Sequence, residues 1–414
     1  MKQEGNTKRA LAVGIGCFLL AAAGLGMTGA KSQYVDAIRM DLGYSTSFMT
    51  GMVSLSTLSM AVTCLFFAPL HRLLKTIRRI VFTGMIAICL GYVIPAVLHS
   101  PAALVIGYLL QGFGLACLAD VPISTLVNNW FTNNPGTVLG LCFMGSGIGG
   151  VVFNPVTGLL IKNVGWSGSY LVTAAVTIVL VLPVLILGRD RPADAETGAP
   201  EGAPVVKKRD EGEKLSILEA LRLPGFIPFL LVTLLAGLCI PAVQHNSSPI
   251  LNAAGIDPTV TAFIMSVIYA SLSVGKVVMG ICNDRLGARV TISIQTGAYV
   301  LAVLVLIVMT VFVHSVALGV VFAVIFGFSY TWQSLAQPSA LRVLIDKKYF
   351  SSCLGITVAM LHFGSAFSVT VAGIVKDAVG SYTPVLIVYA AAVSAAFAFY
   401  QILFSRRAKA VAGT

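Results

Sequence analysis

Long apolar stretches alternate with short polar segments along the whole chain. A helix needs about 20 mostly apolar residues to cross the hydrocarbon core of a bilayer, and twelve stretches meet this requirement. The sequence therefore predicts an all-α integral membrane protein with twelve transmembrane helices. We expect these spans at roughly residues 10–35, 46–70, 79–99, 102–130, 136–162, 167–188, 225–250, 259–283, 289–312, 315–340, 350–375 and 382–405.

The segment between the sixth and seventh stretches is different, because it is charged and rich in Pro, Gly and Ala. This composition is typical of a linker. We expect an N-terminal six-helix bundle at 1–188, a cytoplasmic linker at 189–223 and a C-terminal six-helix bundle at 224–414. The apolar start of the chain also fits a signal peptide, but the many similar stretches after it favour a retained first span.

Composition agrees with a membrane protein. Of the 414 residues, 57% are hydrophobic and only 10% are charged, whereas soluble domains carry roughly 25% charged residues. The mean hydropathy is +0.91. A chain this apolar cannot cover itself with a wetted surface, so we expect membrane lipid around it.

The net charge of +11 would fit a nucleic-acid partner, but its distribution indicates membrane topology instead. If both termini are cytoplasmic, 22 of the 27 Lys and Arg residues fall in cytoplasmic segments. Such a bias predicts the orientation of a membrane protein. We therefore expect cytoplasmic N- and C-termini in a cell membrane, with a bacterial inner membrane as the first candidate, and no nucleic-acid partner.

Several kinds of chemistry lack their sequence signature. The eight cysteines lie in apolar stretches without a C-x-x-C pair, so neither a disulfide framework nor a metal site is predicted. The phosphate-binding pattern G-x-x-x-x-G-K-[ST] does not occur. No Ser/His/Asp constellation stands out either. We expect a protein that is not an enzyme, uses no cofactor or metal and is not driven by ATP.

Two charged side chains lie deep in the predicted spans, Lys276 and Asp120. An ionisable group at that depth costs about 2.5–3.5 kcal/mol on insertion scales and marks a functional site by default. At 1.5 Å per residue the two lie at a similar depth. We interpret Lys276 as a receptor for a carboxylate. The alternative is an ammonium that reaches for the cytoplasmic surface, but that surface is about 12 Å away along the helix.

Asp120 has two interpretations. It can carry a proton or serve as counter-ion to Lys276, or it can bond the nearby hydroxyls of Ser124 and Thr125 and hold a helix break at Pro122. If it pairs with Lys276 in the empty protein, a substrate carboxylate would compete with it for the ammonium. Protonation of Asp120 would then couple anion uptake to a proton.

Two motifs resemble the major facilitator superfamily. The stretch "GICNDRLGAR" matches the loop motif of that superfamily after the eighth span, as it should. The stretch "YLLQGFGLA" matches its fourth-span motif, except that Tyr108 stands where an arginine belongs. The resemblance implies two pseudo-symmetric six-helix bundles and a conformational gating loop. The gating residues would be Gly280, Asp284, Arg285, Gly287 and Arg289.

A narrower resemblance is to the monocarboxylate transporters and the oxalate:formate antiporters. "WFTNNPGTVLGLCFMG" is similar to the monocarboxylate transporter signature, although asparagines replace its basic pair. Lys31 begins a lysine–serine pair similar to one at the outer end of their first span. Lys276 stands four residues before Gly280, where those families place a substrate-binding arginine. Their acid one turn earlier is replaced by Leu272.

Three further residues are candidates for substrate binding. Tyr330 and Gln333 lie on the tenth span, which lines the cavity in this superfamily, and His362 lies on the eleventh span. An imidazole inside a span is unusual. His362 also lies near the position of the second buried cation of the oxalate:formate antiporter, although that lysine itself has no counterpart here. For Tyr330, the alternative to substrate binding is packing against neighbouring helices.

Together these features predict a secondary active transporter that moves a small organic anion by alternating access, functions as a monomer, and works by proton symport or anion exchange. A monocarboxylate is the first candidate and a dicarboxylate the second. Proton-coupled efflux of amphipathic drugs is a rival function. A ligand-binding membrane sensor is another, although it would be expected to carry a soluble signalling domain.

Overall fold

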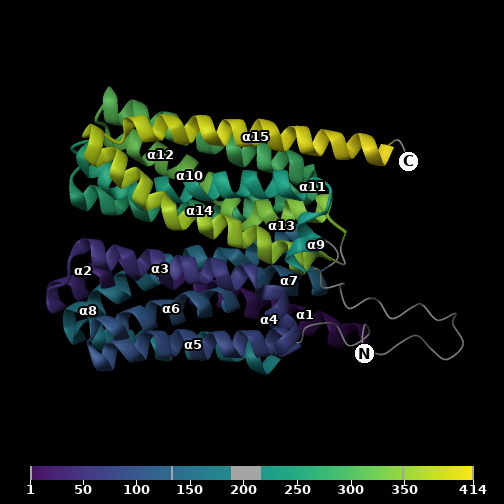
Figure 1. The fold of residues 1–414 in the computed structure, drawn as a ribbon, viewed down its shortest axis with the longest axis horizontal. Coiled ribbons are helices and arrows are strands. Elements are labelled where there is room, and N and C mark those ends of the chain that lie inside the picture. Colours follow the sequence, from purple (N-terminus) through teal and green to yellow (C-terminus); the bar gives the residue numbers. More distant parts are fainter. Residues whose placement is uncertain (1, 132–133, 188–215, 347–348, 413–414) are drawn as a thin grey trace, which may run out of the picture.

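Two helical bundles lie side by side with their long axes aligned (Figure 1). The computed structural model describes residues 2–131, 134–187, 216–346 and 349–412. The predicted linker at 189–223 lies mostly outside the described residues, which resume at Ser216. The first bundle contains α1 (Lys2–Ala21), the π-helical turn η1 (Ala22–Gly26), the 3-10 turn η2 (Met27–Ala30), α2 (Lys31–Leu42), α3 (Thr46–Leu65), α4 (Phe67–Leu74), α5 (Ile77–Leu98), α6 (Pro101–Leu118), α7 (Asp120–Trp130) and α8 (Pro135–Leu187).

A short helix, α9 (Ile217–Leu221), precedes the second bundle. Ser216 caps it, and the backbone N–H of Ser216 donates to Glu219 at 2.7 Å. That hydrogen bond holds the pKa of the Glu219 carboxyl below its usual value. The second bundle contains α10 (Phe226–Ala253), α11 (Pro258–Val311), α12 (Val316–Tyr330), α13 (Trp332–Leu344), α14 (Phe350–Val379) and α15 (Thr383–Ala412).

The helix lengths agree with twelve crossings. Within the described residues, nine helices are long and apolar enough to span a membrane, and a helix pair bent by 65° at Phe66 adds a tenth. Two of the nine are 52 and 49 residues long, enough for two crossings each. They break at Gly165 and Gly287, where φ is 72° and 81°. Such φ values favour glycine, so these two residues turn the chain back.

Two predicted breaks are present but lie at particular residues that the sequence did not single out. The turn predicted at "NDRLGAR" (283–289) is present but is confined to Gly287, and α11 is helical on both sides of it. The helix break expected near Pro122 lies at Ala119, between α6 and α7. Pro122 falls within the first turn of α7, where a proline is tolerated because those N–H groups have no helical partner.

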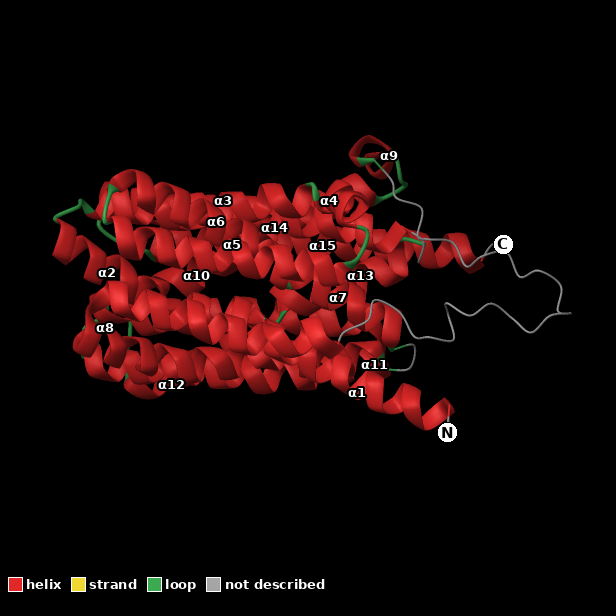
Figure 2. Cartoon of the chain, turned by 90° about the horizontal axis from the view of Figure 1, so that it is seen from below, coloured by secondary structure: helices red, strands yellow, loops and turns green. Residues whose placement is uncertain are grey.

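Both chain termini lie at the same end of the molecule, and so does α9 (Figures 1 and 2). We call this end the terminal face. The two bundles contact each other through α8 with α11 and through α3 with α14. Near the terminal face, Gly355 of α14 approaches Cys64 and Phe67 of the first bundle. The bundles are therefore packed together at this end.

The orientation can be tested with cysteines placed at opposite ends. Lys162 is exposed at the end opposite the terminal face, and Arg79 is exposed near the terminal face. If the terminal face is cytoplasmic, a membrane-impermeant maleimide will label Lys162→Cys on intact cells. It will label Arg79→Cys only after permeabilisation. The unsubstituted protein controls for its native cysteines, and the reverse pattern would contradict the orientation.

Candidate functional site

The bundles approach each other closely where α8 contacts α11. Glycines of α8 face the backbone of α11. A Cβ atom added at Gly136 would lie only 2.8 Å from the carbonyl oxygen of Gly280, which is too close for any side chain. Gly140 likewise faces the backbone of Lys276. Small residues at such spacing allow two helices to approach closely. The contact continues to Gly150, which faces the ring of Tyr269. This approach brings the Lys276 side chain against the opposite bundle.

The ammonium group of Lys276 has only uncharged partners. Its Nζ atom donates to the backbone oxygen of Phe143 at 3.2 Å and to the hydroxyl of Ser146, and it lies 5.7 Å from the centre of the Phe143 ring. Among the described residues, no carboxylate lies within 4.0 Å of this atom. Lys276 is 4% exposed. The side chain crosses to the other bundle, so it does not reach for the terminal face.

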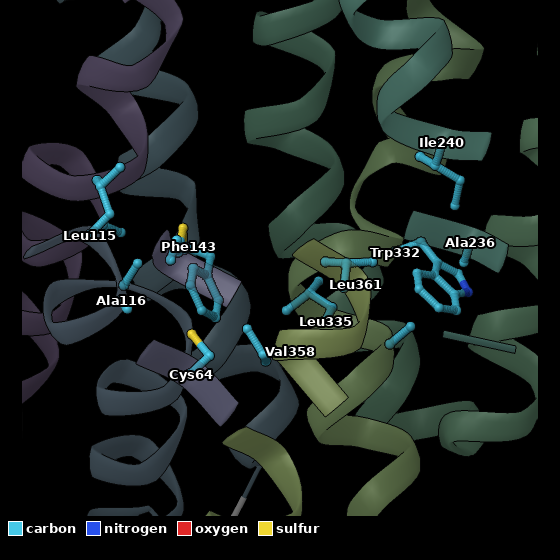
Figure 3. Packing of buried hydrophobic residues seen from close by; sticks show 14 of the residues in the cluster. Cys64, Leu115, Ala116, Phe143, Ala236, Ile240, Trp332, Leu335, Val358 and Leu361 are labelled. Atoms are coloured by element: carbon cyan, nitrogen blue, oxygen red, sulfur yellow. The ribbon is translucent and has the colours of Figure 1, made fainter. Parts of the chain in front are cut away.

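Figure 3 shows buried apolar side chains of both bundles in the region of Phe143, whose backbone oxygen accepts the hydrogen bond from Lys276. Cys64 and Phe143 of the first bundle and Val358 and Leu335 of the second belong to one buried cluster. A charge in such surroundings interacts with other charges far more strongly than it would in water. The cluster therefore makes Lys276 sensitive to any anion that approaches.

The second charged group, Asp120, also contacts the opposite bundle. Its Oδ2 atom lies 3.4 Å from Nε2 of His362 on α14, and both side chains are buried. Asp120 is the first residue of α7, where the positive end of the helix dipole stabilises a carboxylate. The hypothesised direct pair of Asp120 with Lys276 is not formed here, although the two groups interact electrostatically. Thr125, another suggested partner of Asp120, lies 3.4 Å from Ser351 instead.

The other candidate substrate-binding residues are Tyr330, Gln333 and Lys31, and they do not all lie near Lys276 and Asp120. Tyr330, the last residue of α12, is half-buried and lies within electrostatic range of Asp120. Gln333 is half-buried in the first turn of α13. Lys31 donates to Ser56 at 3.0 Å and so joins α2 to α3 within the first bundle. The structure thus brings Lys276, Asp120, His362 and Tyr330 together, whereas Lys31 bonds elsewhere.

The sequence did not predict that Ser146 and Phe143 are the partners of Lys276. Both lie in the glycine-rich stretch "GLCFMGSGIGG", whose pattern indicates helix packing. The only signal for Ser146 was a hydroxyl among glycines on a span. Nothing marked a backbone oxygen as the partner of a lysine 133 residues away.

A cavity of about 350 Å³ lies away from these charges, near the terminal face. Its walls come from α4, from α9 and from the ends of α3 and α14 at the terminal face. They include Leu65, Arg72, Ser216 and Ile356. This cavity contains none of the four clustered residues. The charged cluster itself is packed in this conformation.

The predicted gating residues lie where α11 meets the start of α8. The carboxylate of Asp284 accepts hydrogen bonds from the backbone N–H groups of Gly136 at 2.8 Å and Thr137 at 2.5 Å. These are free donors of a helix N-terminus, which favours an anion. Arg285 is exposed, and Arg289 donates to Gln401 at 2.7 Å. Of the motif's charged side chains, Asp284 makes the contact between bundles.

Comparison with known proteins agrees with the fold. The family model described as Major Facilitator Superfamily matches residues 16–369. The fucose:proton symporter FucP of E. coli has a similar fold, with a TM-score of 0.69 and 14% sequence identity over 95% of this chain and 98% of that one.

Two curated relatives are more similar in sequence. The MFS-type transporter YcxA of Bacillus subtilis (strain 168) is 24% identical over 314 residues, 74% of each chain. Monocarboxylate transporter 13 of Rattus norvegicus is 27% identical over 316 residues, 75% of this chain and 69% of that one. The predicted resemblance to the superfamily, including its monocarboxylate transporters, is thereby confirmed.

The Asp284 contact can be tested by replacing Asp284 with Asn. A hydrogen bond to a charged group contributes about 1.5–3 kcal/mol and a neutral one about 1 kcal/mol, so Asp284→Asn should favour separation of the bundles at the terminal face roughly 2- to 30-fold. The measurement is the yield of a disulfide between Thr125→Cys and Ser351→Cys, whose native hydroxyls lie 3.4 Å apart. We expect a lower yield with Asp284→Asn.

The control is Asp346→Asn, which removes an exposed carboxylate in the loop after α13. It should leave the cross-linking yield unchanged. Equal yields for both variants would show that Asp284 does not hold the bundles together.

Proposed function

Since this chain belongs to the Major Facilitator Superfamily, we propose that it is a secondary active transporter for a small organic anion, with a monocarboxylate as the first candidate. The bundles would be residues 1–188 and 224–414, and substrate would reach the contact between them by alternating access. The observation that supports this function best is the buried ammonium of Lys276, which has only uncharged partners among the described residues.

The electrostatic argument favours an anion. Two neutral oxygens only partly replace the water that a buried ammonium loses. A carboxylate at the same place would supply the opposite charge, in surroundings where charges attract strongly. One ammonium fits one carboxylate, which places a monocarboxylate before a dicarboxylate. Similarity to a protein named monocarboxylate transporter 13 supports the same order.

Anion binding would also loosen the contact between the bundles. Lys276 belongs to α11, and its partners Phe143 and Ser146 belong to α8. A carboxylate that takes over the ammonium must displace at least one of these hydrogen bonds. Substrate binding would thereby weaken a contact that holds the bundles together. This gives a physical reason for a carrier to change conformation when it is loaded.

The conformation described here is packed at the terminal face. With cytoplasmic termini, the site would be closed toward the cytoplasm, and substrate would enter from the opposite side. Opening would require Asp284 to leave the N-terminus of α8. Lys276 lies two helical turns from Asp284 on α11. The gating residue Asp284 and the proposed substrate-binding residue Lys276 therefore belong to one rigid helix.

The function can be tested by replacing Lys276. Purified protein in liposomes would be assayed for saturable uptake of labelled formate, acetate, pyruvate, L-lactate, oxalate and succinate. Lys276→Gln keeps a hydrogen-bond donor but removes the charge, so we expect uptake to fall at least about 100-fold, as for the loss of a 3 kcal/mol interaction. Lys276→Arg should retain part of the uptake.

The control is Lys162→Gln, which removes an exposed lysine far from the site and should transport normally. Normal uptake by Lys276→Gln would rule out the proposed role. Absence of any saturable carboxylate uptake by the unsubstituted protein would rule out the proposed function. Export of lipophilic cations in its place would favour drug efflux.

A further inference from the structure

The pair of Asp120 and His362 suggests how anion transport is driven. We propose that this pair is the proton-binding site of the transporter, and that one proton taken up by His362 accompanies each monocarboxylate that binds at Lys276. The inference rests on the proposed function, because it assigns a coupling ion to the same transport cycle. It moves His362 from the substrate site to the proton site.

Geometry supplies the first argument. Asp120 lies on α7 of the first bundle and His362 on α14 of the second, and their side chains meet at 3.4 Å although 242 residues separate them. Both are buried. A titratable pair inside a span, away from water, is rare outside functional sites. Because each bundle contributes one member, the pair must separate or rearrange when the bundles move.

The chemistry of the contact places the proton. An ionised carboxylate only accepts hydrogen bonds, so the Nε2 atom that faces Asp120 must carry a hydrogen. In neutral His362 the other ring nitrogen, Nδ1, then has a free lone pair. A proton from water can bind there, which forms an imidazolium ion beside the Asp120 carboxylate. When the site opens to the other side, Nδ1 returns the proton to water.

The groups around the pair set its charge. Asp120 lies within electrostatic range of the Lys276 ammonium on α11, the Tyr330 phenol on α12 and the Cys64 thiol on α3. Other charged groups on helices packed against α14, such as Arg72, Arg342 and Glu219, lie toward the terminal face. Lys276 is thus the one cation among the groups named here that interacts with the pair.

Charge balance then links the two ligands. With neutral His362, the charges of Lys276 and Asp120 cancel. A bound monocarboxylate adds one negative charge to a buried site, which is unfavourable in a medium of low dielectric constant. One proton on His362 restores neutrality. It also gives Asp120 a positive partner of its own, so the ammonium of Lys276 becomes available to the substrate.

The test uses His362→Gln, because glutamine can still donate a hydrogen bond to Asp120 but cannot titrate. Protein in liposomes would take up the labelled monocarboxylate that the unsubstituted protein transports best. Two modes are compared: uptake driven by an exterior one pH unit more acidic than the interior, and exchange against internal unlabelled anion at equal pH. The control is His314→Gln, which removes an exposed imidazole in the turn after α11.

We expect the acid exterior to raise the initial uptake several-fold, up to about tenfold for a tenfold proton gradient, in the unsubstituted protein and in His314→Gln. In His362→Gln this stimulation should disappear, and exchange should fall as well, because the anion-loaded site then keeps a net negative charge. Asp120→Asn, which leaves Lys276 without a counter-charge, should likewise make uptake independent of pH.

Three outcomes would overturn the inference and leave the transport function standing. They are full acid stimulation in His362→Gln, full acid stimulation in Asp120→Asn, and an unsubstituted protein that exchanges carboxylates without acid stimulation. If the unsubstituted protein shows no saturable carboxylate uptake in either mode, the proposed function and the proton site fail together.

Discussion

The ammonium group of Lys276 joins the two bundles through oxygen atoms that carry no formal charge. Several features of the structure around Lys276 are tied to this contact. It requires the glycines of α8, because a larger residue at Gly140 would meet the backbone of Lys276. It requires apolar surroundings, because water would satisfy the ammonium at no cost. The constraint leaves a buried cation with hydrogen bonds but without a counter-ion in direct contact.

Both charged contacts at this depth cross between the bundles. Lys276 extends from the second bundle to the first, and Asp120 of the first bundle meets His362 of the second. Neither bundle can move without changing the partners of a buried ionisable group. Because such groups are costly to leave without partners, the energy of each conformation depends on what occupies the site. That dependence is what a carrier needs if its movement is to follow its loading.

The sequence predicted the fold because the membrane restricts the possible structures so strongly. Backbone groups in hydrocarbon must bond within helices, so apolar length alone indicated the crossings. It also singled out Lys276 and Asp120, since a charge in a span stands out in any apolar stretch. Partners were harder to predict. Nothing local in the chain connects Asp120 with His362 or Lys276 with Ser146.

The choice of side chains agrees with a site that must both hold and release its ligands. Arginine would bind a carboxylate with two parallel hydrogen bonds and would stay charged under all conditions. Lysine offers a single point charge, which neutral oxygens can satisfy when the anion leaves. Histidine changes its charge near neutral pH, whereas an arginine at position 362 would keep Asp120 permanently paired. With lysine and histidine on separate helices, an anion alone or a proton alone leaves the buried cluster charged. Only the empty cluster and the doubly loaded cluster are neutral, and these are the two states that a symporter must carry across the membrane.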